Sequence, residues 1–181
     1  MDYIKNDKYP EGKIPVSVLK NFKDYGRPDL RDLSENFFLI RPPVVNAGHD
    51  VNSANQILQN CLGLSDVNRF LIVNTPVGQV KIFNNQTEHV IKKRLDARER
   101  YSNFIIPTLK NPFEIYSSIF DGDLTAQFIG LYKAGLNIMV ATTVVVGKPM
   151  IFRNMMPAYN KTINRHRRGD LIFVKRYDNQ V

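Results

Sequence analysis

Residues 89–101, HVIKKRLDARERY, carry most of the reactive side chains that lie close together in this sequence. They include one histidine, two lysines and three arginines, which are opposed only by Asp96 and Glu99. An imidazole exchanges protons near neutral pH, and a guanidinium binds phosphate through paired hydrogen bonds. This combination favours acid–base chemistry at a phosphate, provided that both kinds of group reach the same point.

The helical geometry of this segment contains a conflict. Residues 87–109 have a helical pattern, with Thr87 as the expected N-cap. On one straight helix His89, Lys93, Asp96 and Arg100 form a polar stripe, while Ile91, Leu95, Ile105, Ile106 and Leu109 form an apolar arc. Arg94 and Arg98 fall inside that arc, where an unpaired guanidinium would be costly to bury.

Two arrangements remove the conflict. Either the helix breaks between Arg94 and Ala97, or an arginine points through the apolar arc into a cleft that binds phosphate. A third reading is that the arginines reach the rim and pair with carboxylates such as Asp96 or Glu114, and we favour this for Arg94. His89 and Arg98 are nine residues apart, which is about 180° on a straight helix. Both can serve one site only if the helix breaks, so we predict the break.

The positive charge is confined to one half of the chain. Residues 1–88 contain ten Lys/Arg and ten Asp/Glu, whereas residues 89–181 contain fifteen and seven, so the whole net charge of +8 lies in the second half. This asymmetry indicates a polyanionic partner, first of all nucleic acid, although a basic surface kept for solubility is the plain alternative.

Other chemistries find little support. The three histidines and the single cysteine, Cys61, have no zinc-ligand spacing, and VVVGKP (144–149) lacks the spacing of a phosphate-binding loop. No serine nucleophile elbow is present. We therefore expect neither a metal nor a cofactor.

The pattern of elements predicts an α+β fold. Residues 51–64 are expected to form a helix, residues 68–83 a β-hairpin, and five further segments between 111 and 176 strands, with a short helix at 157–166. Helices followed by strands favour helices packed on one face of an antiparallel sheet. Residues 1–50 are broken by Pro and Gly and are expected to be a partly ordered extension or arm, with the folded domain at 51–181.

The order of four segments resembles a known family. TPVGQVKIF (75–83), the stretch 88–116, FIGLYKA (128–134) and NKTINRHRRGDLIF (160–173) are similar to the phage-associated nuclease-like domains of the barnase–EndoU–colicin–RelE superfamily. The resemblance covers about residues 66–176. It implies N-terminal helices on a four- or five-stranded antiparallel sheet, and a metal-independent ribonuclease that lays its substrate across the exposed face of that sheet.

The resemblance also assigns residues to the site. It places His89, Arg98 and Lys133 in catalysis, and it places Arg100, Tyr101, Asn164 and Arg167 at the substrate. The polar stripe and the basic loop NRHRRGD (164–170) add Lys93 and Arg168 as expected substrate-binding residues. From chemistry alone, His166 is the second candidate for proton transfer, and Tyr132 and Tyr159 could stack on bases.

Two functions of different classes remain open. The first is a ribonuclease that cuts RNA such as tRNA, acting as a phage or prophage toxin or host-takeover factor and countered by an immunity or antitoxin protein. The second is a non-catalytic phage accessory protein, such as part of a minor head protein, that binds nucleic acid or a virion protein. The N-terminus shows no signal pattern, so we expect action in the cytoplasm of a bacterial host, or delivery with the virion, without a membrane partner.

Overall fold

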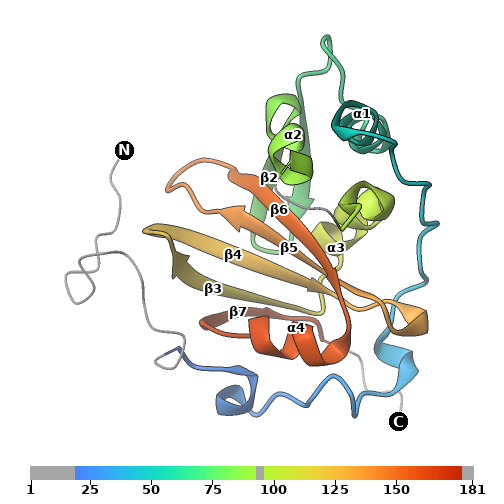
Figure 1. Cartoon of the computed structure of the whole chain (residues 1–181). Helices are drawn as coiled ribbons and strands as arrows, with labels where there is room; N and C mark the ends of the chain where they lie inside the picture. The colour runs from blue at the N-terminus through green and yellow to red at the C-terminus, as the bar shows by residue number, and fades with distance from the viewer. Residues whose placement is uncertain (1–18, 93–95, 177–181) are drawn as a thin grey trace.

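The fold is built on one twisted seven-stranded sheet, seen in a computed structural model that describes residues 19–92 and 96–176. The strand order is β1-β2-β6-β5-β4-β3-β7 (Figure 1). The strands are β1 (Phe70–Thr75), β2 (Gly78–Phe83), β3 (Glu114–Phe120), β4 (Asp123–Gly130), β5 (Asn137–Thr143), β6 (Met150–Ala158) and β7 (Asp170–Val174).

The sheet corrects the expectation of four or five antiparallel strands. All neighbours are antiparallel except β2 and β6, which pair in parallel through Val80–Met150 and Lys81–Ile151. The hairpin β1–β2 therefore joins the five later strands as one edge of the same sheet. The prediction of an α+β fold is confirmed, but the expected packing of the helices on one face is not, because one short helix near the C-terminus lies on the other face.

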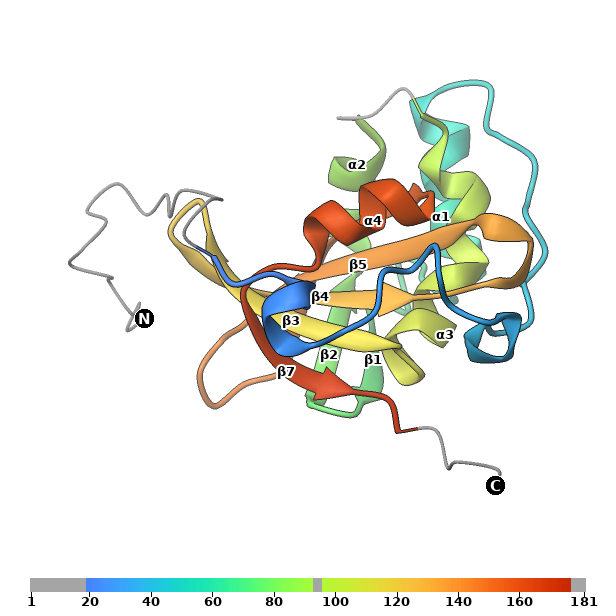
Figure 2. The same cartoon turned by 90° about the horizontal axis from the view of Figure 1, so that it is seen from below.

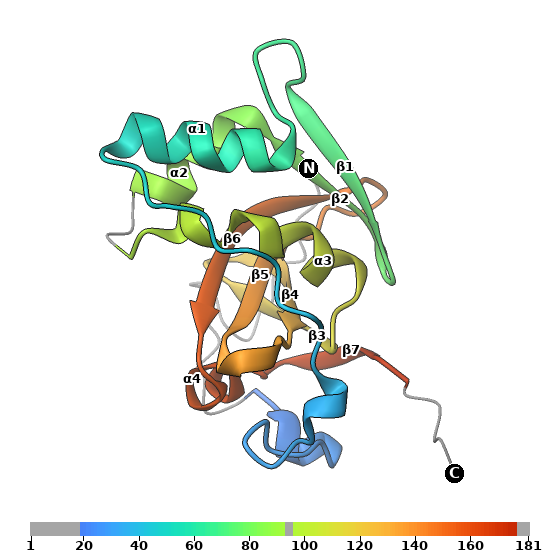
Figure 3. The ribbon, with the colours of Figure 1, turned by 90° about the vertical axis from the view of Figure 1, so that its right-hand side faces the viewer.

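Four helical segments cover one face of the sheet. They are α1 (Val51–Leu62), α2 (Asn84–Lys92), the 3₁₀ helix η4 (Arg98–Phe104) and α3 (Ile105–Lys110) (Figure 3). Their apolar side chains, among them Leu58, Val90 and Phe104, pack with Phe128 and Val140 of the sheet in the larger hydrophobic core. Strand side chains alternate between faces, so the residues next to Phe128 and Val140 point to the opposite side.

A smaller core lies on that opposite side. Helix α4 (Asn160–His166) places Ile163 against Ile129 of β4 and Met139 of β5. Phe22 and Leu30, which precede the first long helix, are buried in the same cluster. Because α4 covers only part of this face, the remainder of the sheet stays open.

The segment 19–50 runs along the domain. It includes the 3₁₀ helices η2 (Phe22–Tyr25) and η3 (Glu35–Phe37) and passes from the side of β7 and β3 to α1 (Figures 2 and 3). Leu39 forms a parallel bridge with Tyr132, and the Val45 amide donates to the Arg100 carbonyl. The arm is thus attached at several points, and a domain boundary near residue 51 stays a prediction.

The expected helix over 87–109 is interrupted. Helix α2 begins directly after β2 at Asn84, not at Thr87, and ends at Lys92. Ala97 has a left-handed backbone with φ of 47°, and η4 starts at the next residue. The break that we predicted is therefore present between Lys92 and Arg98, and Arg94 lies outside the described residues.

A β-bulge bends β6. Ala141 of β5 faces Asn154, whereas its neighbour Thr142 faces Phe152, so Arg153 has no partner in the ladder. An extra residue of this kind changes the direction of the side chains beside it.

Among the described residues, no helix has the length and apolar character needed to cross a membrane.

Candidate active site

A cavity of about 300 Å³ lies on the open face of the sheet. Its floor comes from alternate residues of three strands: Thr125 and Gln127 of β4, Met139 and Ala141 of β5, and Asn154 and Met156 of β6. These residues alternate with those that pack under the helices. The cavity therefore occupies the face on which the resemblance placed the substrate.

Two histidines from different helices line this cavity. His89 is exposed on α2, and His166 is half-buried at the end of α4. His89 also lines a second, more open hollow, together with Phe83 and Arg153. The two hollows adjoin, because His89 and Arg153 line both of them.

The environment of His166 favours its neutral form. Burial lowers the pKa of His166, and the positive charges of Arg165 and Arg168 lower it further. A neutral imidazole at neutral pH can accept a proton from a substrate.

Arg98 lines the cavity but is held by the protein. Its side chain is 3% exposed. Nε donates to both carboxylate oxygens of Asp96 at 2.9 and 3.0 Å, and Nη1 donates to Asn154 Oδ1 and to the Met155 carbonyl at 2.8 Å each. Arg98 thus ties the turn at Asp96, after the helix break, to strand β6. Because the helix breaks, Arg98 and His89 both line the same cavity.

Arg153, on the bulge, is the more accessible arginine of the cavity. Its side chain is 33% exposed, with Asp123 at the start of β4 at 3.4 Å and Asp121 in the β3–β4 turn at 3.9 Å. Its guanidinium also lies 5.5 Å from the centre of the Phe120 ring. A one-third exposed guanidinium between two carboxylates can exchange them for a phosphate.

The structure corrects the expected roles of Arg167 and Asn164. Arg167 is fully buried and forms a paired ion bridge with Glu114, from Nε at 2.7 Å and from Nη2 at 2.8 Å. Arg27 reaches the same carboxylate at 2.7 Å, and Asn164 accepts from Arg167 and donates to Asp29. Both residues hold the segment 19–50 to β3 and α4, so they are not available to a substrate.

Lys133 lies away from the cavity. It begins the short 3₁₀ helix η5 (Lys133–Gly135), which follows the C-terminal end of β4. The cavity instead extends to Asp121, which lies near the N-terminal end of β4, and Lys133 does not line it. Tyr132 is fully buried, its hydroxyl bonds to Thr108, and burial raises its pKa to about 12. It therefore cannot stack on a base.

The other expected binding residues are spread over the surface. Arg100 is exposed on η4, and Tyr101 packs edge-on against Phe104 with ring centres 6.0 Å apart. Arg168 follows α4, with its Nε donating to the Arg165 carbonyl, and Tyr159 is exposed. None of these four lines the cavity, and Lys93 lies outside the described residues.

Sequence reasoning missed Arg153, Asn154, Gln127 and Asp121. Strand alternation could have placed Gln127 and Asn154 on one face, but the bulge that brings Arg153 to the cavity depends on pairing between strands. Within the described residues, no group of three or more His, Cys, Asp or Glu side chains is placed to hold a metal ion.

One of the comparisons with known proteins finds a match. The family model described as "phage-Barnase-EndoU-ColicinE5/D-RelE like nuclease2" matches residues 58–174, close to the range of the resemblance, which is thereby confirmed. No curated protein and no solved structure matches the chain.

Proposed function

Since the chain belongs to the phage-Barnase-EndoU-ColicinE5/D-RelE like nuclease 2 family, we propose that it is a metal-independent endoribonuclease in which His89 and His166 act on one phosphate. The observation that carries this proposal is that both imidazoles, on separate helices, line the same cavity. Cleavage of RNA through its own 2′-hydroxyl needs a base and an acid, and two imidazoles supply both.

The two histidines have different environments. The lowered pKa of His166 makes it the base, because its neutral form is available at neutral pH. It takes the proton of the 2′-hydroxyl as O2′ forms a bond to phosphorus. The bond from phosphorus to O5′ breaks, and His89 gives a proton to the leaving oxygen. The products are a 2′,3′-cyclic phosphate and a free 5′-hydroxyl.

The charge that develops on phosphorus needs donors in fixed positions. Arg153 supplies a cation once a phosphate replaces its two carboxylates. Asn154 Oδ1 accepts from Arg98 and from the Met155 amide, which leaves the Asn154 Nδ2 group to donate to a phosphate oxygen. In this scheme Arg98 is a positioning residue that orients Asn154.

The rest of the cavity suits a nucleobase. Met139, Met156 and Ala141 give it an apolar floor. Gln127 Oε1 is buried there without a hydrogen-bond partner among the described residues. A buried amide beside an apolar floor can bind the hydrogen-bonding edge of a flipped-out base, which is how proteins read single-stranded RNA.

The test is cleavage of total tRNA and rRNA in excess EDTA, with analysis of the product ends. We expect cyclic phosphate and 5′-hydroxyl ends, and a loss of at least about 100-fold in rate for H89A and for H166A. His49, exposed in the segment 19–50, supplies the control H49A, which should cleave normally. Products that require added metal, or 3′-hydroxyl ends, would refute this mechanism.

The second candidate function is binding of nucleic acid without cleavage. A phage accessory protein that only binds nucleic acid would bind RNA through the basic half but leave it intact, so the cleavage assay separates the two functions. We further propose that the protein acts in the cytoplasm of a bacterial host and is countered by an immunity protein; a phage-associated nuclease family is consistent with action inside a bacterial cell.

A further inference from the structure

The outward face of the β1–β2 hairpin carries an unusual group of side chains. Phe70 and Phe83 are cross-strand partners with ring centres 6.4 Å apart. Lys81 places its ammonium 3.9 Å from the centre of the Phe70 ring and 4.7 Å from that of Phe83. We call these three residues the hairpin patch.

Folding does not account for the hairpin patch. The opposite face of the hairpin, with Val73, Val80 and Ile82, supplies the contacts to the core. Phe70 nevertheless remains 47% exposed, and Lys81 forms no ion pair within the described residues. An exposed ring and a half-buried ring around a cation that forms no ion pair within the described residues indicate a binding surface.

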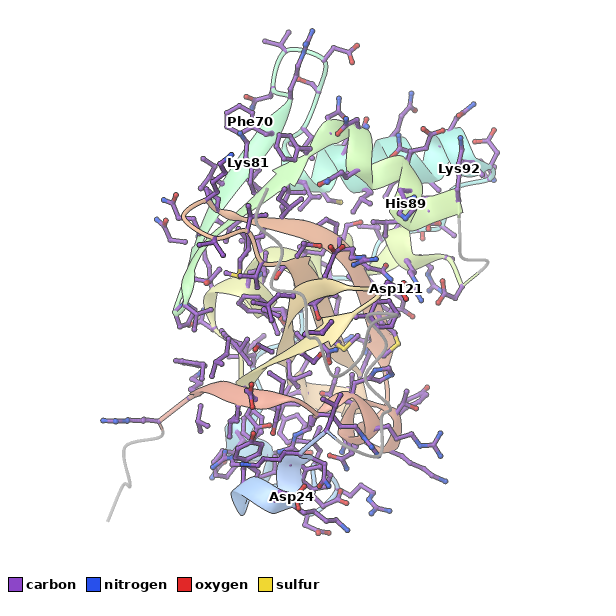
Figure 4. All side chains as sticks on the ribbon, turned by 90° about the vertical axis from the view of Figure 1, so that its left-hand side faces the viewer. Asp24, Phe70, Lys81, His89, Lys92 and Asp121 are labelled. Atoms are coloured by element: carbon purple, nitrogen blue, oxygen red, sulfur yellow. The ribbon has the colours of Figure 1, made fainter. Side chains whose placement is uncertain are left out.

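The hairpin patch is continuous with the candidate active site. Phe83 lines the more open hollow together with His89 and Arg153. Lys81 pairs across the parallel ladder with Ile151, which lines the same hollow. Figure 4 shows Phe70 and Lys81 on the hairpin, with His89 and Asp121 bordering the open face of the same sheet.

We propose that the hairpin patch is a subsite for a nucleotide that flanks the cleaved phosphate of single-stranded RNA. The base stacks on the two phenyl rings, chiefly on the exposed ring of Phe70, and the ammonium of Lys81 binds the adjoining phosphate. Aromatic side chains accept any base by stacking, and a cation beside them follows the backbone. The inference rests on the proposed ribonuclease function and extends it to a substrate longer than a dinucleotide.

The hairpin patch has a simpler reading, in which Lys81 covers the two rings and keeps an edge of the sheet soluble. The two readings differ in what removal of the rings does. If Lys81 only shields them, RNA binding does not depend on the rings. If they form a subsite, replacing them weakens the binding of a long RNA and spares a dinucleotide.

The experiment uses the full chain with H89A and H166A, so that RNA is not cut. Fluorescence anisotropy measures the affinity for a labelled single-stranded hexanucleotide in this background, with and without F70L and F83L. Leucine keeps the apolar volume and removes the ring. We expect F70L/F83L to weaken binding by at least about tenfold. K81M should weaken binding less, and it should reduce the dependence of affinity on salt.

The control is Y159L, because Tyr159 is an exposed aromatic residue that lines neither hollow. It should bind the hexanucleotide as the parent does. Equal affinity for F70L/F83L and parent would overturn the subsite and assign the hairpin patch to another partner, such as a protein.

Cleavage by the catalytically intact chain gives a second readout. F70L/F83L should lower kcat/KM for the hexanucleotide by about tenfold and leave that for a dinucleotide unchanged. Equal losses on both substrates would also overturn the subsite. If the intact chain cuts neither substrate but F70L/F83L still weakens binding, the ribonuclease proposal fails and the subsite stands.

Discussion

Two arginine clusters on the same sheet look alike in burial but differ in what surrounds them. Around Glu114, Arg167 is fully buried and Arg27 reaches the same carboxylate, at a point where the segment 19–50 is held to the domain. Around the cavity, Arg98 is almost as buried, yet its partners Asp96 and Asn154 are at a surface that a ligand can reach. Burial and pairing alone therefore do not separate a structural arginine from one that shapes a site.

The comparison suggests three grades of arginine. Arg167 stabilises the fold, Arg98 joins the helix break to the cavity, and Arg153 is one-third exposed on the bulge, where its carboxylate partners are also at the surface. Substitutions at the three positions should therefore affect stability and cleavage in opposite order.

The largest expected effect on stability comes from E114Q. A neutral amide leaves two guanidinium groups without their anion in a buried site, and breaking such a pair costs about 3–5 kcal/mol. Denaturant unfolding measures the free energy of unfolding. The exposed pair Lys92–Glu88 provides the control K92A, which should unfold as the parent does. If E114Q and K92A unfold alike, the network around Glu114 does not hold the fold.

R98A should reduce both stability and cleavage. It leaves the Met155 carbonyl and Asn154 Oδ1 without their charged donor, for a loss of about 2–3 kcal/mol in the free energy of unfolding. R98K should restore only part of either property, because an ammonium cannot form the planar set of bonds. The control is R100A on the same 3₁₀ helix, where the side chain is exposed. Normal cleavage by a destabilised R98A would show that Arg98 does not orient the site.

R153A should mainly reduce cleavage. Its carboxylate contacts are exposed at the surface, so their loss costs at most about 1 kcal/mol of stability. Removal of a donor to the developing charge should lower kcat by about 10²–10³, while R153K keeps part of the rate. K148A, an exposed position before β6, is the control. If R153A lowers the free energy of unfolding but leaves kcat unchanged, Arg153 stabilises the fold and takes no part in cleavage.

The smallest effect is the pH dependence due to His166. Its pKa is lowered in the folded protein, so the unfolded chain binds the proton first as pH falls below the ordinary histidine value of 6.5. The stability contributed by His166 is therefore complete above pH 6.5 and is lost as pH falls through the lower pKa of the folded state. The variant H166Q should show a smaller loss of unfolding free energy over this window. Parallel curves for H166Q and parent would contradict the burial of a neutral imidazole.

The sequence predicted local features better than distant contacts. The helix at α1 follows from its apolar spacing and from Gly63, which has φ of 67° at the C-cap. The break before Arg98 was predicted because the family resemblance places His89 and Arg98 in one site, and because a break relieves the burial of arginines in an apolar arc. Local spacing contains the information for such features.

The features of the fold and the site that the sequence did not predict depend on contacts between distant segments. The parallel pairing of β2 with β6 adds the hairpin to the sheet, and the bulge at Arg153 depends on the register with β5. The family resemblance placed Arg167 at the substrate, but its burial depends on pairing with Glu114, 53 positions earlier. Composition showed which half was basic, but it could not show which arginine had an internal partner.

The central claim is that His89 and His166 act on one phosphate, and a double-mutant cycle tests it most directly. The measurement is kcat/KM for cleavage of a single RNA by the parent, H89A, H166A and the double variant. Because both imidazoles would serve the same step, the double variant should lose far less than the two single losses combined. Fully additive losses, or no loss at either position, would contradict the shared site.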